Sequence, residues 1–243
     1  MKKVSIITTT YNDSANLRKT IQQVEAQDYE NIEYIIVDGA SKDDTLQVIA
    51  EAKERFGDRL VWISEKDSGI YDAINKGLRL ATGDFIGLCF DQFASPDVIS
   101  KMVSIMEKEG TDGVHGDLDY VDGEKIVRKW RQGQGNIRSG WMPGHPTLYL
   151  KKEVYDKYGV YKTDYRISAD YEYMIRILKD GKVKLSYIPE VLIKMFHGGT
   201  STNGLGAYLE GLKEGHRALK ENGVKFAFVT DLLRILRVLR QFV

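Results

Sequence analysis

Residues 32–45 read IEYIIVDGASKDDT, a run rich in isoleucine and valine that passes directly into polar and small residues. The run 32–37 predicts a buried strand, and the Asp-Gly pair that follows it predicts a turn. Apolar residues then recur with helical spacing over 46–56. Strand, polar loop and helix in this order predict one unit of a parallel sheet with a crossover helix.

The same unit recurs on both sides of this stretch. Strands are predicted at 4–8, 60–63 and 85–89, and helices at 16–27 and 70–81. Polar clusters follow three of these strands, at residues 9–12, 38–44 and 91–92. Ligands of open parallel sheets bind at the carboxyl ends of the strands. A ligand site is therefore predicted at that edge.

Beyond residue 110 the alternation gives way to mixed structure. Strands are predicted at 113–118, 125–130, 147–150 and 185–188, and helices at 98–108 and 170–178. No internal repeat and no linker interrupts the chain. The pattern predicts one α/β domain made of two unlike halves.

The composition excludes several classes of protein. The 243 residues carry 35 basic and 35 acidic side chains, and 42% are hydrophobic, which is typical of a globular chain and not of a disordered one. Zero formal charge argues against a nucleic-acid partner bound through bulk electrostatics, although a local basic patch stays open. Cys89 is the sole cysteine, so an internal disulfide and a cysteine-based zinc site are excluded. With an apolar start too short for a signal or a membrane span, we expect a cytoplasmic protein.

Four motifs in order carry a resemblance to a known family. They are VSIITTTYN (4–12), YIIVDGASKDDT (34–45), EKDSGIYDAINKG (65–77) and ATGDFIG (81–87). The chain resembles the family 2 glycosyltransferases, which have the GT-A fold with a Rossmann-like, mostly parallel sheet.

The resemblance implies an inverting transfer of a hexosyl or N-acetylhexosaminyl group from a UDP- or dTDP-sugar to a hydroxyl acceptor. Bacterial surface polysaccharide or glycolipid assembly is the implied setting. The single domain would then comprise a nucleotide-sugar half (1–112), an acceptor and catalytic half (113–203) and a C-terminal helical extension (204–243).

The donor residues are expected at the first three strand ends. Asp38 can accept the N3–H of a uracil or thymine, and the ring of Tyr11 can stack on the base beside the Thr9 backbone. An Asp-Gly turn is the alternative at Asp38. The family closes over the donor at Asp67, Gly69 and Asn75. Gly69 is expected to permit close backbone approach, while Asn75 could equally be a hydrogen-bonded helix residue.

A metal site is expected at Phe90-Asp91-Gln92. The family has a pair of carboxylates after this strand, which bind Mg²⁺ or Mn²⁺ and neutralise the leaving diphosphate. Here a single acid, Asp91, is followed by Gln92, which could act as a neutral ligand. The departure leaves both metal affinity and activity open.

The expected general base is Asp170, in the segment Ser168-Ala169-Asp170-Tyr171-Glu172. A carboxylate must take the proton of the acceptor hydroxyl as that oxygen attacks the anomeric carbon. A helix N-cap is the alternative at Asp170. His145, between Gly144 and Pro146, is expected to contact the acceptor or the diphosphate. His197 opens a Gly-Gly segment that could close over phosphates and add a metal ligand, or simply form a tight turn.

Two other functions stay open. A nucleotidyltransferase would need a glycine-rich, basic loop after the first strand, and residues 8–12 have none. A catalytically silent sugar-nucleotide-binding protein is compatible with the single carboxylate at Asp91.

The C-terminal stretch, residues 224–243, has a local charge of +3 and predicts an amphipathic helix. Thr230 and Gln241 lie on one flank with three arginines. Phe228, Leu232, Ile235, Leu236, Leu239 and Phe242 lie on the opposite arc. Such a helix can bind an anionic membrane, here at its cytoplasmic face, where a lipid-linked glycan acceptor would lie. Alternatively the apolar arc packs on the protein's own core or on a second subunit of a homodimer.

Overall fold

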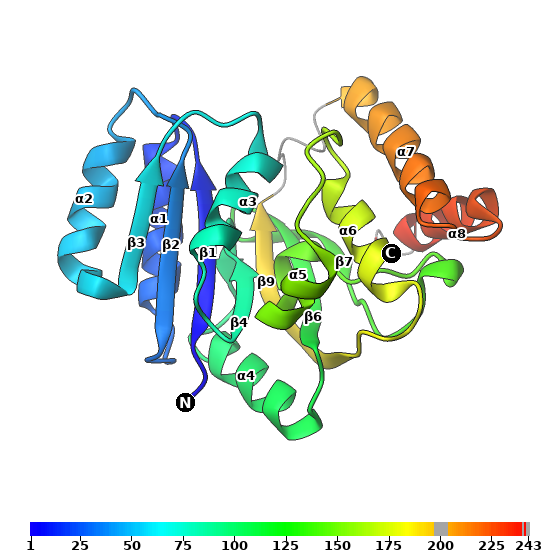
Figure 1. Ribbon diagram of the computed structural model, residues 1–243, viewed down its shortest axis with the longest axis horizontal. Helices are drawn as coiled ribbons and strands as arrows, with labels where there is room; N and C mark the ends of the chain where they lie inside the picture. Colours follow the sequence, from blue (N-terminus) through cyan, green and yellow to red (C-terminus); the bar gives the residue numbers. More distant parts are fainter. Residues whose placement is uncertain (197–203, 240, 242–243) are drawn as a thin grey trace.

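The computed structural model describes residues 1–196, 204–239 and 241. Its strands form one nine-stranded mixed sheet in the order β3-β2-β1-β4-β8-β6-β9-β5, with β7 paired to β6 (Figure 1). The strands are β1 (Val4–Thr10), β2 (Ile32–Asp38), β3 (Leu60–Ser64), β4 (Phe85–Leu88), β5 (Gln92–Phe93), β6 (Gly113–Asp122), β7 (Lys125–Trp130), β8 (Tyr149–Lys151) and β9 (Leu185–Phe196). The helices are α1 (Ser14–Glu25), α2 (Thr45–Phe56), α3 (Ile70–Leu80), α4 (Val98–Glu109), α5 (Lys152–Tyr158), α6 (Ala169–Leu178), α7 (Gly204–Glu221) and α8 (Ala227–Leu239), with 3₁₀ turns η1 (Gly57–Arg59), η2 (Ile137–Ser139) and η3 (His145–Thr147).

The first four strands are parallel, as predicted. β1 lies between β2 and β4, and β2 pairs with β3. Successive residues point to opposite faces, so Ile6 and Ile36 lie in one core whereas Ile7 and Ile35 lie in the other. Both faces are covered, which is why these strands carry continuous apolar runs.

Two helical layers cover the sheet. α1, α2 and α4 pack on one face, and α3, α5, α6 and α7 pack on the other (Figure 1). Each core includes residues from before and after position 112, such as Val4 with Val114 and Ile7 with Tyr173. The two halves of the chain therefore share their hydrophobic cores.

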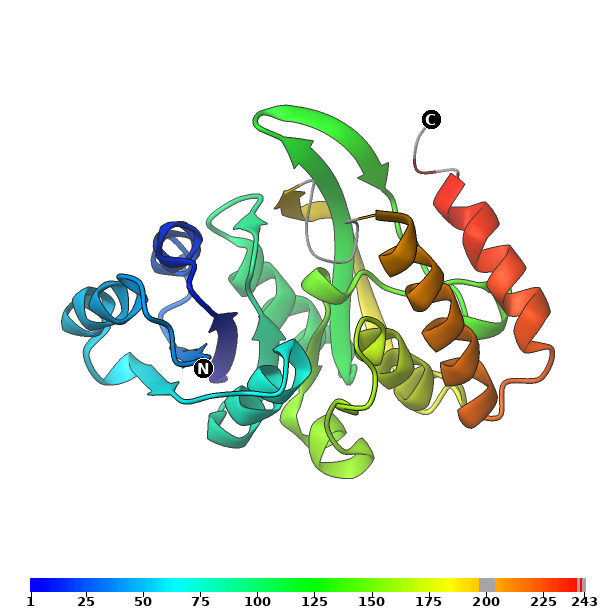
Figure 2. The same ribbon diagram turned by 90° about the horizontal axis from the view of Figure 1, so that it is seen from above.

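The second half departs from the predicted elements in three ways. β6 and β9 are longer than expected, pair in parallel with each other, and leave the β6–β7 hairpin projecting beyond the sheet (Figure 2). The predicted strand 147–150 is wrong at its start: Thr147 belongs to η3, because its hydroxyl and its N–H both donate to the Gly144 carbonyl at 2.9 Å. α5 was not predicted from the sequence, and neither was β5, which belongs to the first half of the chain.

The helix α8 is amphipathic, but its polar flank faces the protein. The guanidinium of Arg234 lies 4.3 Å from the ring centroid of Tyr171 in α6, and the Arg237 Nε donates to the Ser139 carbonyl at 2.9 Å. Gly140 permits α8 to approach η2 closely, because a Cβ at Gly140 would lie 2.4 Å from the backbone nitrogen of Arg234. The alternative that the apolar arc packs on the protein's own core is therefore wrong for the described residues, since Phe228 is 75% exposed and Leu239 is 60% exposed; Phe242 of this arc lies outside the described residues.

Within residues 1–196, 204–239 and 241, no helix has the length and hydrophobicity that a membrane span requires.

Candidate active site

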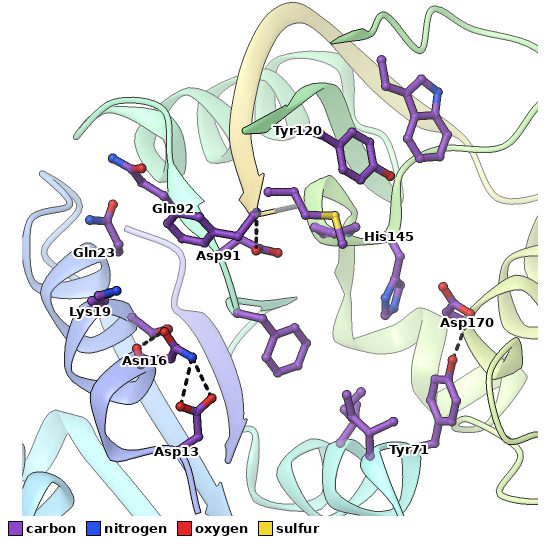
Figure 3. Close-up of a pocket in the computed structure, with 18 of the residues that line it drawn as sticks. Asp13, Asn16, Lys19, Gln23, Tyr71, Asp91, Gln92, Tyr120, His145 and Asp170 are labelled. Carbon is purple, nitrogen blue, oxygen red and sulfur yellow. Dashed lines mark hydrogen bonds between the residues drawn. The ribbon is translucent and has the colours of Figure 1, made fainter. Parts of the chain in front are cut away.

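A cleft of about 980 Å³ opens between α1 and α6 and contains three of the predicted site residues. Figure 3 shows Asp91 on the α1 side, Asp170 on the opposite side, and the ring of His145 between them. Tyr71 of α3 lines the floor beside Asp170. The cleft thus brings together groups that come from four separate segments of the chain.

Asp170 lies in the first turn of α6. The N-cap of this helix is Ser168, so the alternative role of Asp170 as the N-cap is wrong. Its Oδ1 accepts a hydrogen bond of 3.1 Å from the Tyr71 hydroxyl. Glu172 points elsewhere, as expected, and is fully buried against Arg176 at 2.8 Å. Asp170 is therefore the carboxylate of this segment that faces the cleft.

His145 opens η3, and its Nε2 lies 2.8 Å from the Tyr161 hydroxyl. Burial lowers the pKa of this imidazole, an effect that the charge of Asp170 partly opposes. The ring is therefore neutral near pH 7, and it can exchange a hydrogen bond with a bound molecule without adding a positive charge.

Asp91 is a carboxylate without a cationic partner in the part of the chain that the structure describes. Its Oδ1 accepts a 3.3 Å hydrogen bond from the Phe196 N–H. Burial raises the pKa of Asp91 to about 6, against the smaller lowering effect of that hydrogen bond. A buried acid of this kind favours either a proton or a cation.

The surroundings of Asp91 fit a metal ion that one protein carboxylate holds together with the phosphates of a bound substrate. Among the described residues, no three His, Cys, Asp or Glu side chains cluster closely enough to hold a metal by themselves. Gln92 lies in β5, and its amide extends toward α1 and away from the Asp91 carboxylate (Figure 3). Mg²⁺ commonly takes one or two carboxylates together with substrate phosphates and water. Asp91 supplies one such carboxylate.

The predicted donor edge lies at the ends of β1 to β3. The loops after β1 and β2 are tied together, since the Asn12 N–H donates to the Ser41 hydroxyl at 2.7 Å. Asn12 (φ 49°) and Ala40 (φ 63°) are in the left-handed region that non-glycine residues seldom adopt. Strained backbone of this kind clusters at functional sites.

Gly39 forms the floor of this edge. A Cβ on Gly39 would lie 2.7 Å from Asp67 Oδ2 and 3.2 Å from Tyr11 Cδ2. The Tyr11 ring itself is 63% exposed. Tyr11 and Asp67 therefore pack closely against the Gly39 backbone and leave no room for a side chain there; we call these three residues the Gly39 cradle.

Asp38 ties the loop after β2 to the end of β3. Its carboxylate is fully buried and accepts hydrogen bonds from the Ser41 N–H at 3.0 Å and the Ser64 hydroxyl at 2.6 Å, as well as from the Ser41 hydroxyl. Thr9 lies one residue before the end of β1, in register with Val37. The direct contacts of Asp38 and Thr9 with a base stay predictions.

The loop that leads into α3 is stabilised by its own hydrogen bonds. Asp67 Oδ1 accepts the Gly69 N–H at 2.9 Å. Gly69 has φ 131°, which side-chain-bearing residues rarely adopt, and apart from its chain neighbours no atom of the described residues lies within 4 Å of where its Cβ would be. Backbone conformation therefore requires this glycine, and the surface beside it is open.

Asn75, the remaining predicted site residue that the structure describes, does not line the cleft. Asn75 is 4% exposed, and both ends of its amide bond the backbone of Tyr161. His197 lies outside the described residues.

Several cleft residues were not predicted as site residues. Lys19 of α1 and Arg166 before α6 bring positive charge to the two walls, and Tyr120 and Trp130 of the β6–β7 hairpin bring aromatic surface. Tyr71 lies within the motif at residues 65–77, but its spacing is that of an ordinary helix residue. In the sequence, Leu118 and Tyr120 alternate with Asp117 and Asp119, and this period of two is the signal that could have placed Tyr120 on one face of a strand.

Two solved structures share this architecture. The mannosyltransferase PcManGT from Pyrobaculum calidifontis, in complex with GDP-Man and Mn²⁺, matches with a TM-score of 0.71 and 18% identity, over 97% of this chain and 71% of that one. S. aureus TarS 1–349 in complex with UDP-GlcNAc matches with a TM-score of 0.70 and 14% identity, over 97% and 72%. These likenesses define a protein of the GT-A fold.

Sequence comparisons are more specific. The family described as glycosyl transferase family 2 matches residues 5–167. An uncharacterised glycosyltransferase of Mycobacterium tuberculosis is 32% identical over 187 residues, which cover 71% of this chain and 68% of that protein. A PGL/p-HBAD biosynthesis glycosyltransferase of Mycobacterium bovis is 27% identical over 208 residues, covering 82% and 78%. The chain belongs to glycosyl transferase family 2 and is a glycosyltransferase.

Proposed function

We propose that this enzyme transfers a hexosyl or N-acetylhexosaminyl group from a UDP- or dTDP-sugar to a hydroxyl acceptor, with inversion at the anomeric carbon. The observation that carries the proposal is the opposition of Asp91 and Asp170 across one cleft. A single displacement needs a base on the acceptor side and charge neutralisation on the leaving-group side. The cradle formed by Tyr11, Gly39 and Asp67 supports a nucleoside site at the adjoining edge.

Each wall of the cleft has its own chemical task. Asp170 accepts the proton of the acceptor hydroxyl as that oxygen attacks the sugar. Lys19 and Arg166 attract the diphosphate, and neutral His145 donates or accepts a hydrogen bond beside it. Asp91 would hold Mg²⁺ or Mn²⁺ together with the donor phosphates, and the metal, when bound, supplies positive charge to the departing diphosphate. Neighbours solved with GDP-Man or UDP-GlcNAc are compatible with a nucleotide-sugar donor here.

Release of nucleoside diphosphate tests the proposed reaction. UDP-glucose, UDP-N-acetylglucosamine, dTDP-glucose and GDP-mannose are first ranked by thermal shift with and without Mn²⁺, and turnover of each is then measured. We expect one uridine or thymidine donor to bind and to release its diphosphate. Binding without any release would indicate the silent sugar-nucleotide-binding protein instead. A preference for GDP-mannose would contradict the proposed uracil or thymine nucleobase of the donor.

The acceptor is proposed to lie at a lipid surface, with α8 as the contact. Exposed apolar residues gather on the outward arc of α8 and on the turn before it: Phe226, Phe228, Val229, Leu232, Leu236 and Leu239. Contiguous apolar surface of this kind marks an interaction site. A relative named for PGL/p-HBAD biosynthesis is in keeping with a glycolipid acceptor. This contact would place the enzyme at the cytoplasmic face of a membrane.

Vesicle co-sedimentation tests the lipid contact. Because the polar flank holds α8 on the protein, Phe228→Ser with Leu232→Ser removes apolar surface without removing the helix. We expect the parent to bind anionic vesicles and the double variant to stay in the supernatant. Leu46→Ser with Trp62→Ser, at exposed sites on α2 and β3, is the matched control and should bind as the parent does. Equal binding of all three would contradict the lipid contact, and a parent that forms dimers lost in the α8 variant would assign the face to a second copy.

A further inference from the structure

The helix α3 joins the predicted donor edge to the acceptor wall of the cleft. It begins directly after the loop that contains Asp67 and Gly69. Two of its side chains, Tyr71 and Asn75, lie on the same helical face because they are four residues apart. Both reach segments that follow residue 160, so α3 spans the two halves of the site.

Tyr71 contacts the start of α6. Its hydroxyl lies 2.5 Å from the Ile167 carbonyl and 3.1 Å from Asp170 Oδ1. A hydroxyl has one proton, so these two acceptors share it. Burial raises the pKa of Tyr71, and the nearby Asp170 carboxylate adds to that rise, so the hydroxyl stays protonated as a donor. In Figure 3 the dashed line between the two side chains marks this contact at the wall of the cleft.

Asn75 reaches His145 through one intermediate. Its Nδ2 donates to the Tyr161 carbonyl at 2.8 Å, and its Oδ1 accepts the Tyr161 N–H at 3.0 Å. Two bonds to one residue fix the backbone of Tyr161, whose hydroxyl in turn lies 2.8 Å from His145 Nε2. The predicted donor contact at Asn75 thus has a second explanation, namely orientation of a cleft histidine.

We propose that α3 is a positioning element: Tyr71 orients the carboxylate of Asp170, and Asn75 orients His145 through Tyr161. The inference rests on the proposed function, in which Asp170 is the general base. Its consequence is that the donor loop and the base keep a fixed relation, because one rigid helix holds both. Hydrogen bonds of this kind hold a general base within a fraction of an ångström of its working position.

Aromatic packing is the competing explanation for these tyrosines. The Tyr71 and Tyr161 rings stack with centroids 6.0 Å apart, and Tyr173 lies 4.8 Å from Tyr161 in the same cluster. Packing needs only the rings, whereas positioning needs the hydroxyls. Tyr173 provides a matched control, because its buried hydroxyl has no hydrogen-bond partner among the described residues.

The test compares Tyr71→Phe, Tyr161→Phe and Tyr173→Phe in Mn²⁺-dependent hydrolysis of the donor that the ranking selects. We expect Tyr71→Phe to lower kcat roughly 5- to 30-fold, which is the effect expected from the loss of one hydrogen bond to a carboxylate. The donor KM, UDP affinity and melting temperature should stay close to those of the parent. Tyr161→Phe should lower kcat in the same manner, and Tyr173→Phe should leave kcat within about twofold.

A double-mutant cycle separates the two roles further. If Tyr71 acts through Asp170, Tyr71→Phe in the Asp170→Asn background should change the residual rate by less than about twofold. Equal losses in Tyr71→Phe and Tyr173→Phe, or fully additive effects in the cycle, would overturn the inference. Parent-like turnover of Asp170→Asn would instead overturn the proposed base, so the two failures are distinguishable.

Discussion

Asp91→Asn is predicted to make the enzyme more stable and less active. The carboxylate lies in a largely buried position with one backbone N–H as its partner, and burial raises the pKa of Asp91 to about 6. At neutral pH the folded protein therefore carries an ionised group that the fold disfavours. Asparagine has the same shape and keeps an oxygen that can accept the Phe196 N–H, so the substitution removes only the charge.

The magnitude follows from the change in pKa. The ordinary value for this carboxyl is 3.8, so the rise to about 6 corresponds to about 3 kcal/mol at full burial. Because Asp91 opens into the cleft, water reduces this cost, and we expect a gain of about 1–2 kcal/mol in the free energy of unfolding. When the pKa of an acid is higher in the folded state than in the unfolded state, the acid does not lower the free energy of unfolding at a pH below the unfolded-state pKa. Above the folded-state pKa it lowers that free energy by the full amount. The advantage of the variant should therefore appear between pH 4 and pH 6 and stay constant above that.

Urea denaturation of both proteins at pH 4, 5, 6 and 7.5 measures this difference directly. The variant should be equal to the parent at pH 4 and more stable at pH 7.5. It should also lose donor turnover, since a site that costs stability commonly serves function. A variant that is less stable than the parent at pH 7.5, or a difference that does not depend on pH, would refute the reasoning.

Three further predictions follow from other parts of the structure. In calorimetry, Mn²⁺ should tighten UDP binding to the parent and not to Asp91→Ala; equal UDP affinity with and without metal in the parent would exclude a metal at Asp91. Gly39→Ala should weaken UDP binding roughly tenfold, because its Cβ would lie 2.7 Å from Asp67 Oδ2, whereas Gly206→Ala, with open space around it, should not; matching affinities would move the nucleoside away from Gly39. Glu33→Gln should cost about 2 kcal/mol at pH 7: burial alone would raise the pKa of Glu33, but hydrogen bonds from Lys3, Ser5 and Thr82 lower it to about 2. That stabilisation is present above pH 4.5 and is lost toward pH 2, so acid unfolding of the variant should depend less on pH in this range; identical acid transitions would argue against it.

The parallel half of the fold follows from the sequence because buried strands of a parallel sheet have a simple pattern. The runs 4–8 and 32–37 are continuous and apolar, and the structure extends the corresponding strands by one or two residues only. The acceptor half has no comparable pattern. The start of β8 depends on the turn that Thr147 makes with Gly144, and the pairing of β6 with β9 joins segments far apart in the chain.

The orientation of α8 also lies beyond the sequence. Helical periodicity assigns Phe228 and Leu232 to one arc, but it does not say which arc faces the protein. Tyr171, Ser139 and Gly140 decide that question, because they bind or admit the arginine flank. The hydrophobic pattern alone favours the opposite orientation.

In the site, too, some features could be predicted from the sequence and others depend on the tertiary fold. Asp91, His145 and Asp170 were predicted one by one from motifs, and the structure brings them to one cleft. The supports between them could not be predicted, because Tyr71 and Asp170 are separated by 99 positions and Asn75 and Tyr161 by 86. Sequence motifs identify reactive groups, whereas the hydrogen bonds that aim them depend on the tertiary fold.

The most direct test of the central claim is the turnover of Asp170→Asn with the preferred donor, measured beside its affinity for UDP. If Asp170 is the general base, diphosphate release should fall roughly 10²- to 10⁴-fold while UDP affinity stays within about twofold of the parent. Near-normal release by Asp170→Asn, with UDP binding intact, would contradict the account and remove Asp170 from the mechanism.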